Sequence, residues 1–239
     1  MTKKFNIEVY SDGAIIEDMR EDAKKEYVTG FTTNPSLMKK AGITDYMKFA
    51  KEVVSEFPNH SISFEVFGKD HATMKKEALK ITALSDQVFV KIPIILADGS
   101  SNAPLIKDLS DSGIKLNITA IATVDQVKDA LAAVNDNVPS IISIFVGRVA
   151  DTGQDPTDFI KESVELTKSV PAAKLLWAAT REVANVYEAQ AAGVDIITVP
   201  PTILAKLDKV GKPAVQVAID TVKGFDKDIS SLGFSILDN

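Results

Sequence analysis

Eight short apolar runs recur along the chain, and stretches with the pattern of amphipathic helices separate them. Strands that are covered on both faces read as nearly continuous apolar runs, as in the parallel sheets of α/β proteins. The runs are Phe5–Asp12, Tyr27–Asn34, Ser61–Phe67, Gln87–Pro93, Ile114–Thr119, Ser140–Val146, Lys174–Thr180 and Val194–Pro200. This alternation predicts a parallel sheet whose strands are joined by crossover helices.

The segments between the runs carry helix signals. Thr123-Val-Asp-Gln126 has the form of a capping box, and the helical pattern behind it continues to Val134. Asp155-Pro156 places an N-cap residue before a proline at the first helical position. The other expected helices are Ile15–Tyr27, Thr44–Phe57, Asp70–Ala83, Ala103–Ser112, Arg181–Ala192 and Pro213–Ile229.

Eight strands alternating with helices over 239 residues fit a (β/α)8 barrel, which typically has about 250 residues. The fold prediction is therefore an α/β protein, with residues 1–239 as a single barrel domain and an extra C-terminal helical segment at about 212–239. A doubly wound open sheet is the alternative.

One face of several strands carries polar side chains. Alternate residues of a strand share a face, and this parity separates the polar residues from the apolar ones. The polar residues so placed are Asp12, Ser63, Glu65, Lys91, Asn117, Thr119 and Ser143. If the apolar faces meet the helices, these side chains point into the barrel toward the carboxyl ends of the strands, where barrel enzymes place their catalytic groups.

Glu65 and Lys91 need an explanation, because such residues are almost never fully buried without partners. One interpretation is a structural ion pair between them. The other is a catalytic site, because the apolar residues flanking Lys91 disfavour an ammonium group and so favour an amine that attacks a carbonyl. Asp12 and Glu65 would then move protons. The set allows a carbon–carbon lyase or a group transfer through an iminium.

Composition removes several other chemistries. The chain has no cysteine and only two histidines, which argues against disulfides, thiolate nucleophiles, Fe–S clusters and three-histidine metal sites. Its net charge of −6 argues against binding to a nucleic-acid backbone. No signal peptide or membrane-length apolar run is visible. A cytoplasmic protein with no nucleic-acid or membrane partner is expected.

Six segments, in order along the chain, carry a resemblance to a known family. They are Gly30-Phe-Thr-Thr-Asn-Pro-Ser-Leu37, Val90-Lys-Ile-Pro93, Leu116-Asn-Ile-Thr119, Ile142-Ser-Ile-Phe-Val-Gly-Arg-Val149, Trp177-Ala-Ala-Thr-Arg-Glu182 and Ala192-Gly-Val-Asp-Ile-Ile-Thr-Val-Pro200. Together they resemble the transaldolases and the related small fructose-6-phosphate aldolases, and the resemblance extends from residue 5 to about 205. It implies class I aldol chemistry in a barrel on sugar phosphates, in the pentose phosphate pathway, with no metal or organic cofactor.

The resemblance also implies residue roles. Lys91 matches the Schiff-base lysine, Asp12 matches an acid/base carboxylate, and Glu65 with Thr119 matches the pair that holds a catalytic water. The residues that match substrate-binding positions are Asn34, Thr33, Asn117, Ser143, Phe145, Arg148 and Arg181. The two arginines match phosphate-binding groups, which suits the forked geometry of the guanidinium.

Several of these residues also have a structural interpretation. Asn34 before Pro35 suits a turn, and Arg148 suits a salt bridge at a strand end. Thr119 and Ser143 suit the satisfaction of backbone groups in a closed barrel.

Two positions separate the two branches of the family. The aldolase branch has glutamine where this chain has Glu65 and tyrosine where it has Phe145. Because Phe145 has no hydroxyl to protonate an enamine, transfer of the three-carbon unit is expected rather than its release. The family's usual serine on the seventh strand falls at Ala179 or Thr180. A C-terminal helix also assembles some small members into rings, so a homo-oligomer is expected here, although Pro213–Leu237 also suits a cap on its own barrel.

Overall fold

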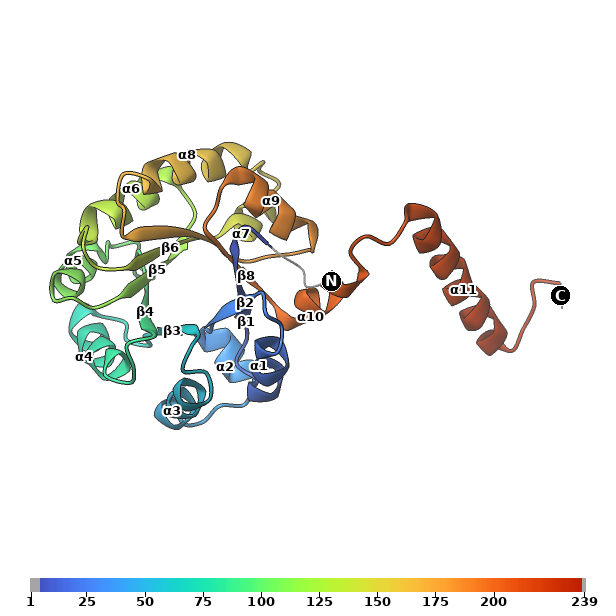
Figure 1. The fold of residues 1–239 in the computed structure, drawn as a ribbon, viewed down its shortest axis with the longest axis horizontal. Helices are drawn as coiled ribbons and strands as arrows, with labels where there is room; N and C mark the ends of the chain where they lie inside the picture. Colours follow the sequence, from blue (N-terminus) through green and yellow to red (C-terminus); the bar gives the residue numbers. More distant parts are fainter. Residues whose placement is uncertain (1–4, 238–239) are drawn as a thin grey trace. The chain divides into compact units, whose positions relative to one another are not determined.

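The computed structural model describes residues 5–237, in which eight parallel strands close into a barrel (Figure 1). The strands are β1 (Glu8–Asp12), β2 (Val28–Thr32), β3 (Ser61–Glu65), β4 (Val88–Pro93), β5 (Leu116–Ile121), β6 (Ser140–Ile144), β7 (Ala173–Trp177) and β8 (Ile196–Val199). Each strand pairs with the next in sequence, and β8 pairs with β1 to close the ring. The (β/α)8 prediction is confirmed, and the open-sheet alternative is wrong.

The longer helices follow the predicted segments with shorter ends. They are α1 (Ile16–Ala23), α3 (Tyr46–Glu56), α4 (His71–Thr82), α5 (Ala103–Asp111), α6 (Val124–Ala133), α8 (Thr157–Thr167), α9 (Ala184–Ala192) and α11 (Ala214–Leu232). The capping box at Thr123 and Gln126 forms as predicted. Asp155 accepts hydrogen bonds from the backbone and hydroxyl of Thr157, and α8 begins at Thr157, one residue later than expected.

Short helices also follow three of the strands, and the sequence pattern did not predict them. They are α2 (Pro35–Lys40), α7 (Val146–Ala150) and α10 (Pro201–Leu204), with the 3-10 turn η1 (Ala205–Lys209) after the last. None exceeds six residues, so none is long enough to display an amphipathic period. They matter because α2 and α7 begin at the carboxyl ends of strands, beside predicted site residues.

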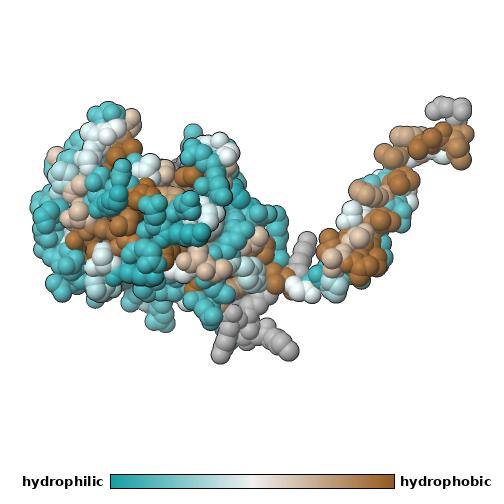
Figure 2. All heavy atoms as spheres, turned by 90° about the horizontal axis from the view of Figure 1, so that it is seen from above, coloured by the Kyte–Doolittle hydropathy of each residue, from teal (hydrophilic) through white to brown (hydrophobic). Residues whose placement is uncertain are grey.

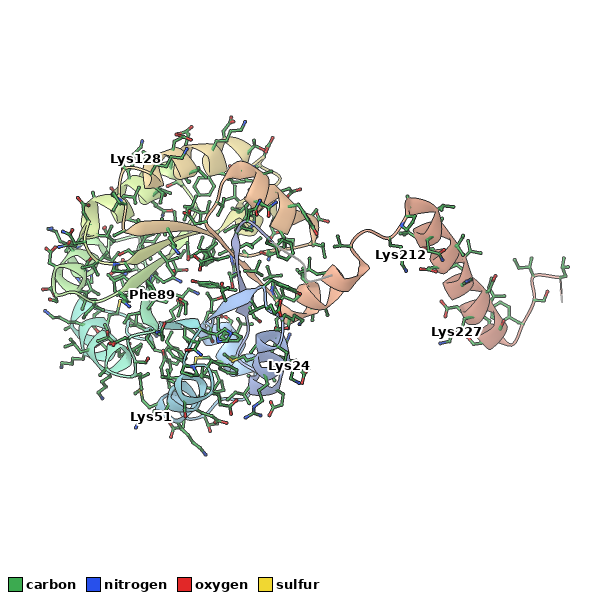
Figure 3. The ribbon with its side chains drawn as sticks, in the orientation of Figure 1. Lys24, Lys51, Phe89, Lys128, Lys212 and Lys227 are labelled. Atoms are coloured by element: carbon green, nitrogen blue, oxygen red, sulfur yellow. The ribbon has the colours of Figure 1, made fainter. Side chains whose placement is uncertain are left out.

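The barrel interior is apolar below and polar above. Its apolar layer consists of Tyr10, Ile141, Leu176, Ala178 and Ile196, with Phe89 and Phe145 packed against it. Figure 3 shows Phe89 among the strands, whereas Lys24, Lys51 and Lys128 lie at the periphery, on or next to the surrounding helices. This cluster fills the barrel interior with side chains, as in a packed core rather than a pore, and its members Leu176, Ala178 and Phe145 also line a cavity beside the polar residues.

Residues from Ala205 onward form a second compact unit, distinct from the unit that ends at Leu204. This second unit contains α11, none of whose residues is buried. Figure 2 shows apolar side chains along this helix. The prediction of a single domain over residues 1–239 stays a prediction. Within residues 5–237, no helix combines the length and apolar character needed to cross a bilayer.

Candidate active site

Lys91 lies inside the barrel on β4 with only 6% of its surface exposed. Its Nζ lies 3.2 Å from Oε2 of Glu65, on the neighbouring strand β3. The same nitrogen donates a 3.2 Å hydrogen bond to the carbonyl oxygen of Thr33. The ion pair considered from the sequence therefore exists. It also holds the amine in place, so the structural and the catalytic interpretations are compatible.

Next to Lys91, three polar side chains form a buried hydrogen-bonded row across β3, β5 and β6. Asn117 Nδ2 donates to Ser63 Oγ at 3.0 Å, and Ser143 Oγ donates to Asn117 Oδ1 at 2.6 Å. All three residues are at most 1% exposed. These bonds fix which way the Asn117 amide faces.

Thr119 continues the polar face of β5 beyond Asn117. Its hydroxyl is buried and makes no hydrogen bond to any residue among 5–237. Buried polar atoms almost always have partners, so a buried hydroxyl of this kind calls for an explanation. The hydroxyl is therefore not committed to the backbone groups of the barrel, but Thr119 is not among the residues that line the cavity described below.

Asp12 ends β1, and burial raises the pKa of its carboxyl, while the charge of Lys91 and a hydrogen bond from Thr32 oppose that rise. Thr32 Oγ1 lies 2.7 Å from Asp12 Oδ1. The sequence comparison singled out the next residue, Thr33, and missed Thr32. Thr32 pairs directly with Asp12 across β1 and β2. Strand parity within the run Tyr27–Asn34, which was not applied to this strand, was the signal available in the sequence.

A cavity of about 140 Å³ opens above this polar layer. Its lining includes Asp12, Thr32, Asn34, Lys91, Ser143, Phe145, Arg148, Leu176, Ala178, Ala179, Arg181 and Thr198. The structure thus brings seven of the predicted site residues to one cavity. Glu65 and Asn117 touch members of that group by an ion pair and a hydrogen bond. Thr33 contributes its carbonyl to Lys91, and its predicted substrate contact stays a prediction.

The two arginines stand at the rim of the cavity. Arg181 pairs with Asp151, with Nη2 2.5 Å from Oδ2, and this contact lowers the pKa of the Asp151 carboxyl. The guanidinium of Arg148 lies 5.8 Å from the ring centre of Phe145. Arg148 has no ion-pair partner in the part of the chain that the structure describes. The charge of Arg148 nevertheless contributes, after that of Arg181, to lowering the pKa of the Asp151 carboxyl.

Asn34 is the N-cap of α2, and its Oδ1 accepts a 3.0 Å hydrogen bond from the backbone of Leu37. This is the local role that the sequence allowed. It does not exclude the other, because the Asn34 side chain also lines the cavity and its amide nitrogen is a separate donor.

The structure also answers the question of the seventh-strand serine. Ala179 lines the cavity and has no hydroxyl. Thr180 is buried, and its hydroxyl donates to the carbonyl oxygen of Thr198 at 2.7 Å. Neither residue therefore offers a free hydroxyl to a ligand at this position.

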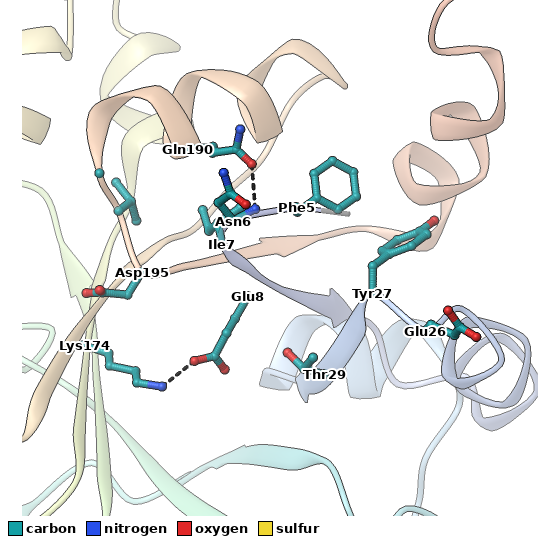
Figure 4. Close-up of a pocket in the computed structure, with 12 residues that line it drawn as sticks. Phe5, Asn6, Ile7, Glu8, Glu26, Tyr27, Thr29, Lys174, Gln190 and Asp195 are labelled. Atoms are coloured by element: carbon teal, nitrogen blue, oxygen red, sulfur yellow. Dashed lines mark hydrogen bonds and ion pairs between the residues drawn. The ribbon is translucent and has the colours of Figure 1, made fainter. Parts of the chain in front are cut away.

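A larger cavity of about 690 Å³ lies at the opposite end of the barrel (Figure 4). It is lined by residues at the beginnings of strands, including an ion pair between Glu8 and Lys174 and a hydrogen bond from the Asn6 backbone to Gln190. Barrel enzymes place their chemistry at the carboxyl ends of the strands. The smaller cavity around Lys91 is therefore the candidate active site, despite the difference in volume.

With this geometry established, the chain can be compared with known proteins. Residues 9–236 match the family model of transaldolase/fructose-6-phosphate aldolase. The chain belongs to this family. It is 34% identical to a probable transaldolase of Erythrobacter litoralis, over 97% of this chain and all of that protein. It is also 34% identical to a probable transaldolase of Clostridioides difficile, over 89% of this chain and 93% of that protein.

Solved structures of more distant proteins share the fold. A 3-hexulose-6-phosphate synthase from Salmonella typhimurium matches with a TM-score of 0.57 and 11% identity, over 86% of this chain and 94% of that one. KGPDC from Streptococcus mutans matches with a TM-score of 0.56 and 12% identity, over 84% of this chain and 90% of that one. At such identities the likeness speaks for the barrel fold alone.

Proposed function

We propose that this protein is a transaldolase, which moves a dihydroxyacetone unit from a ketose phosphate to an aldose phosphate through a Schiff base on Lys91. One observation carries the proposal: a buried lysine amine, held by Glu65 and the Thr33 carbonyl, faces a cavity that Asp12 and two arginines also line. Membership of the family and the names of its relatives support the same activity. Sedoheptulose 7-phosphate and fructose 6-phosphate are the proposed donors.

The chemistry begins when the amine of Lys91 attacks the ketose carbonyl to give a carbinolamine, whose hydroxyl takes a proton from an acid group of the site and leaves as water, which forms an iminium. A carboxylate of the Asp12 and Glu65 pair, acting directly or through water near Thr119, accepts the proton of the C4 hydroxyl. The C3–C4 bond breaks, its electrons move into the iminium to give an enamine, and an aldose phosphate departs. The enamine then adds to the aldehyde carbon of a second aldose phosphate, and hydrolysis frees the product and Lys91.

The remaining residues of the cavity bind the substrate. Asn34 and Ser143 line the cavity and offer an amide and a hydroxyl for the hydroxyls of the three-carbon unit, and Asn117, hydrogen-bonded to Ser143, is proposed to bind there as well. Arg148 and Arg181 bind the phosphate, for which their forked donors are suited. Arg181 exchanges its contact with Asp151 for the phosphate or shares it between the two.

Trapping with borohydride tests this proposal. The protein is incubated with fructose 6-phosphate, reduced, digested and analysed by mass spectrometry. A three-carbon adduct on Lys91, absent from the Lys91→Met variant, is the expected result. An adduct on another lysine, or none, would overturn the mechanism.

The acceptor dependence of turnover separates transfer from cleavage. A transaldolase converts fructose 6-phosphate only when erythrose 4-phosphate or another aldose phosphate is supplied. Rapid release of dihydroxyacetone without an acceptor would instead identify an aldolase. A sugar-phosphate-binding barrel without activity would bind the ketose and give neither product nor adduct.

We also propose that the protein forms a homo-oligomer through α11. The helix has large apolar side chains on its surface, and within residues 5–237 none of its residues is buried. These side chains are Val215, Val217, Ile219, Val222, Phe225, Ile229 and Leu232. A second copy of the chain is the partner that this proposal names.

A further inference from the structure

Thr198 of β8 has its hydroxyl beside the acid/base group of the site. Thr198 Oγ1 lies 2.5 Å from Thr32 Oγ1, and Thr32 Oγ1 lies 2.7 Å from Asp12 Oδ1. Both threonines are at most 4% exposed. Among the described residues, Thr32 is the one hydrogen-bond partner of the Thr198 hydroxyl. The three side chains therefore form a buried series that ends at the carboxyl of Asp12.

The charge of Asp12 decides which way the protons of this series point. A hydroxyl has one proton to donate, and an ionised carboxylate accepts only. When Asp12 is ionised, Thr32 must donate to it, so the proton between the two threonines must come from Thr198. A hydroxyl that accepts a hydrogen bond becomes a better donor, because the bonds in a series polarise one another. Thr198 therefore strengthens the bond that Thr32 makes to the carboxylate.

The backbone holds Thr198 in place independently of its hydroxyl. Its carbonyl oxygen accepts a 2.7 Å hydrogen bond from Thr180 Oγ1, and its Cα pairs with Tyr10 of β1. Loss of the Thr198 hydroxyl thus leaves two other anchors of this strand segment intact. Loss of the Thr180 hydroxyl affects the same segment without touching the series that leads to Asp12.

Charged groups around Asp12 act on the same carboxyl. The charge of Lys91 lowers the pKa of Asp12, and burial raises it. Glu65 faces Lys91 from β3, and Arg148 and Arg181 line the same cavity. None of these groups contacts the Thr198 hydroxyl, so a change at Thr198 leaves them in position.

We propose that Thr198 is a positioning residue that orients the Thr32 hydroxyl toward Asp12 and so favours the ionised, proton-accepting form of that carboxyl. The contribution of Thr198 to catalysis rests on the proposed function, in which Asp12 is an acid/base group. The effect on Asp12 itself does not depend on turnover.

The test is a ¹³C NMR titration of protein labelled at the side-chain carboxyl carbon of aspartate, with the Asp12 signal assigned by its absence from Asp12→Asn. Thr198→Val should raise the pKa of Asp12 by roughly half a unit, the equivalent of one weakened hydrogen bond. Thr198→Ser, which keeps the hydroxyl, should leave the pKa of Asp12 close to that of the unmodified protein. Thr180→Val is the matched control and should also leave it unchanged.

Two results would overturn the proposal. One is an unchanged pKa of Asp12 in Thr198→Val, and the other is an equal change in Thr198→Val and Thr180→Val, which would indicate a displaced strand. If Thr198→Val does not fold, the comparison of Thr198→Ala with Thr198→Ser gives the same decision. The titration uses unliganded protein, so absence of a Lys91 adduct would reject the proposed function without deciding the role of Thr198.

In an active enzyme the same change has a kinetic readout. The acid limb of the kcat profile should move to higher pH in Thr198→Val, with KM nearly unchanged. Thr198→Ser should restore the original profile. A loss of kcat that is equal at every pH would indicate a structural role alone and would count against the proposal.

Discussion

The Asp12 carboxyl holds its proton more tightly than an aspartate in water, because burial disfavours the charge more than Lys91 and Thr32 favour it. A folded-state pKa above the unfolded value means that the folded state is favoured at low pH, where Asp12 is neutral in both states. That advantage is lost as the pH rises through the folded-state value, because the unfolded chain then ionises more easily. The Asp12 carboxyl therefore costs stability at neutral pH.

Asp12→Asn should consequently raise the free energy of unfolding at pH 8, while kcat falls about 100-fold or more because the proton acceptor is gone. The gain in stability should shrink toward pH 4, as the carboxyl of the unmodified protein becomes neutral in both states. Urea unfolding of the variant and of the unmodified protein at several pH values measures this difference in the free energy of unfolding. Asp151→Asn is the control, since contact with Arg181 lowers the pKa of Asp151, so this change should bring no gain at pH 8. A variant that loses stability at pH 8 would contradict the argument.

Under the proposed function, Phe145 is the residue expected to decide whether the enamine is protonated. Phe145 lines the cavity together with Lys91 and packs against the apolar cluster of the barrel, so we expect a tyrosine here to place its hydroxyl near the site. Phe145→Tyr should therefore raise release of dihydroxyacetone from fructose 6-phosphate without an acceptor, by roughly 10-fold or more, the scale of general acid catalysis.

An enzymatic assay for dihydroxyacetone measures this change. Phe89→Tyr is the matched control, because Phe89 packs against the same apolar layer but lies 5.9 Å from Lys115 and does not line the cavity. Equal release by both variants would show that the effect does not come from a hydroxyl near Lys91.

At the scale of elements, apolar runs and strand parity predicted the eight strands and the interior position of Lys91, Glu65 and Asn117. These features follow from periodicity, which is a property of the sequence itself. The short helices α2 and α7 and the left-handed backbone of two alanines could not be predicted in this way. Ala120 and Ala179 have φ values of 61° and 63°, a conformation that neighbouring structure must impose on alanine.

Ala179 shows what imposes such a conformation. An added Cβ at Gly147, in α7, would lie 1.9 Å from the carbonyl oxygen of Ala179, so the turn after β7 rests directly on the backbone of α7. This contact joins the two segments that bear the arginines, Arg148 and Arg181. The sequence alone could not show whether Ala179 or Thr180 faces the cavity at the family's serine position. That depends on which of the two residues this turn directs inward.

Gly147→Ala should force these two segments apart. We expect the free energy of unfolding to fall by about 1–3 kcal/mol, as for other overpacked sites, and KM for phosphate-bearing substrates to rise more than kcat falls. Urea unfolding and steady-state kinetics measure the two effects. Gly224→Ala in α11 is the control, because an added Cβ there meets nothing within 4 Å, and it should leave KM unchanged. An unchanged KM in Gly147→Ala would show that the contact does not position the arginines.

On the scale of the whole molecule, α11 differs from the helices that surround the barrel. Apolar residues recur at intervals of three and four, at Val215, Ala218, Val222, Phe225, Ile229 and Leu232, while Val217 and Ile219 lie outside this spacing. This spacing is that of a coiled-coil seam, which places the residues along one side of a helix. Val222 is 55% exposed and Phe225 59% exposed. Burial of such a surface stabilises association by about 25 cal/mol per Å² of apolar area, which favours a partner.

Phe225→Glu should therefore dissociate the oligomer, because it places a charge in the middle of the seam, where contact with another copy would bury it without a partner. Sedimentation velocity should show a smaller species than the unmodified protein, with the shift greatest at low concentration. Lys227→Glu introduces the same residue two positions later, on the opposite side of the helix, and should leave the sedimentation coefficient unchanged. Borohydride trapping on Lys91 should persist in both variants, because α11 contributes no residue to the described cavity. A Phe225→Glu variant that sediments like the unmodified protein would show that this seam does not join the copies.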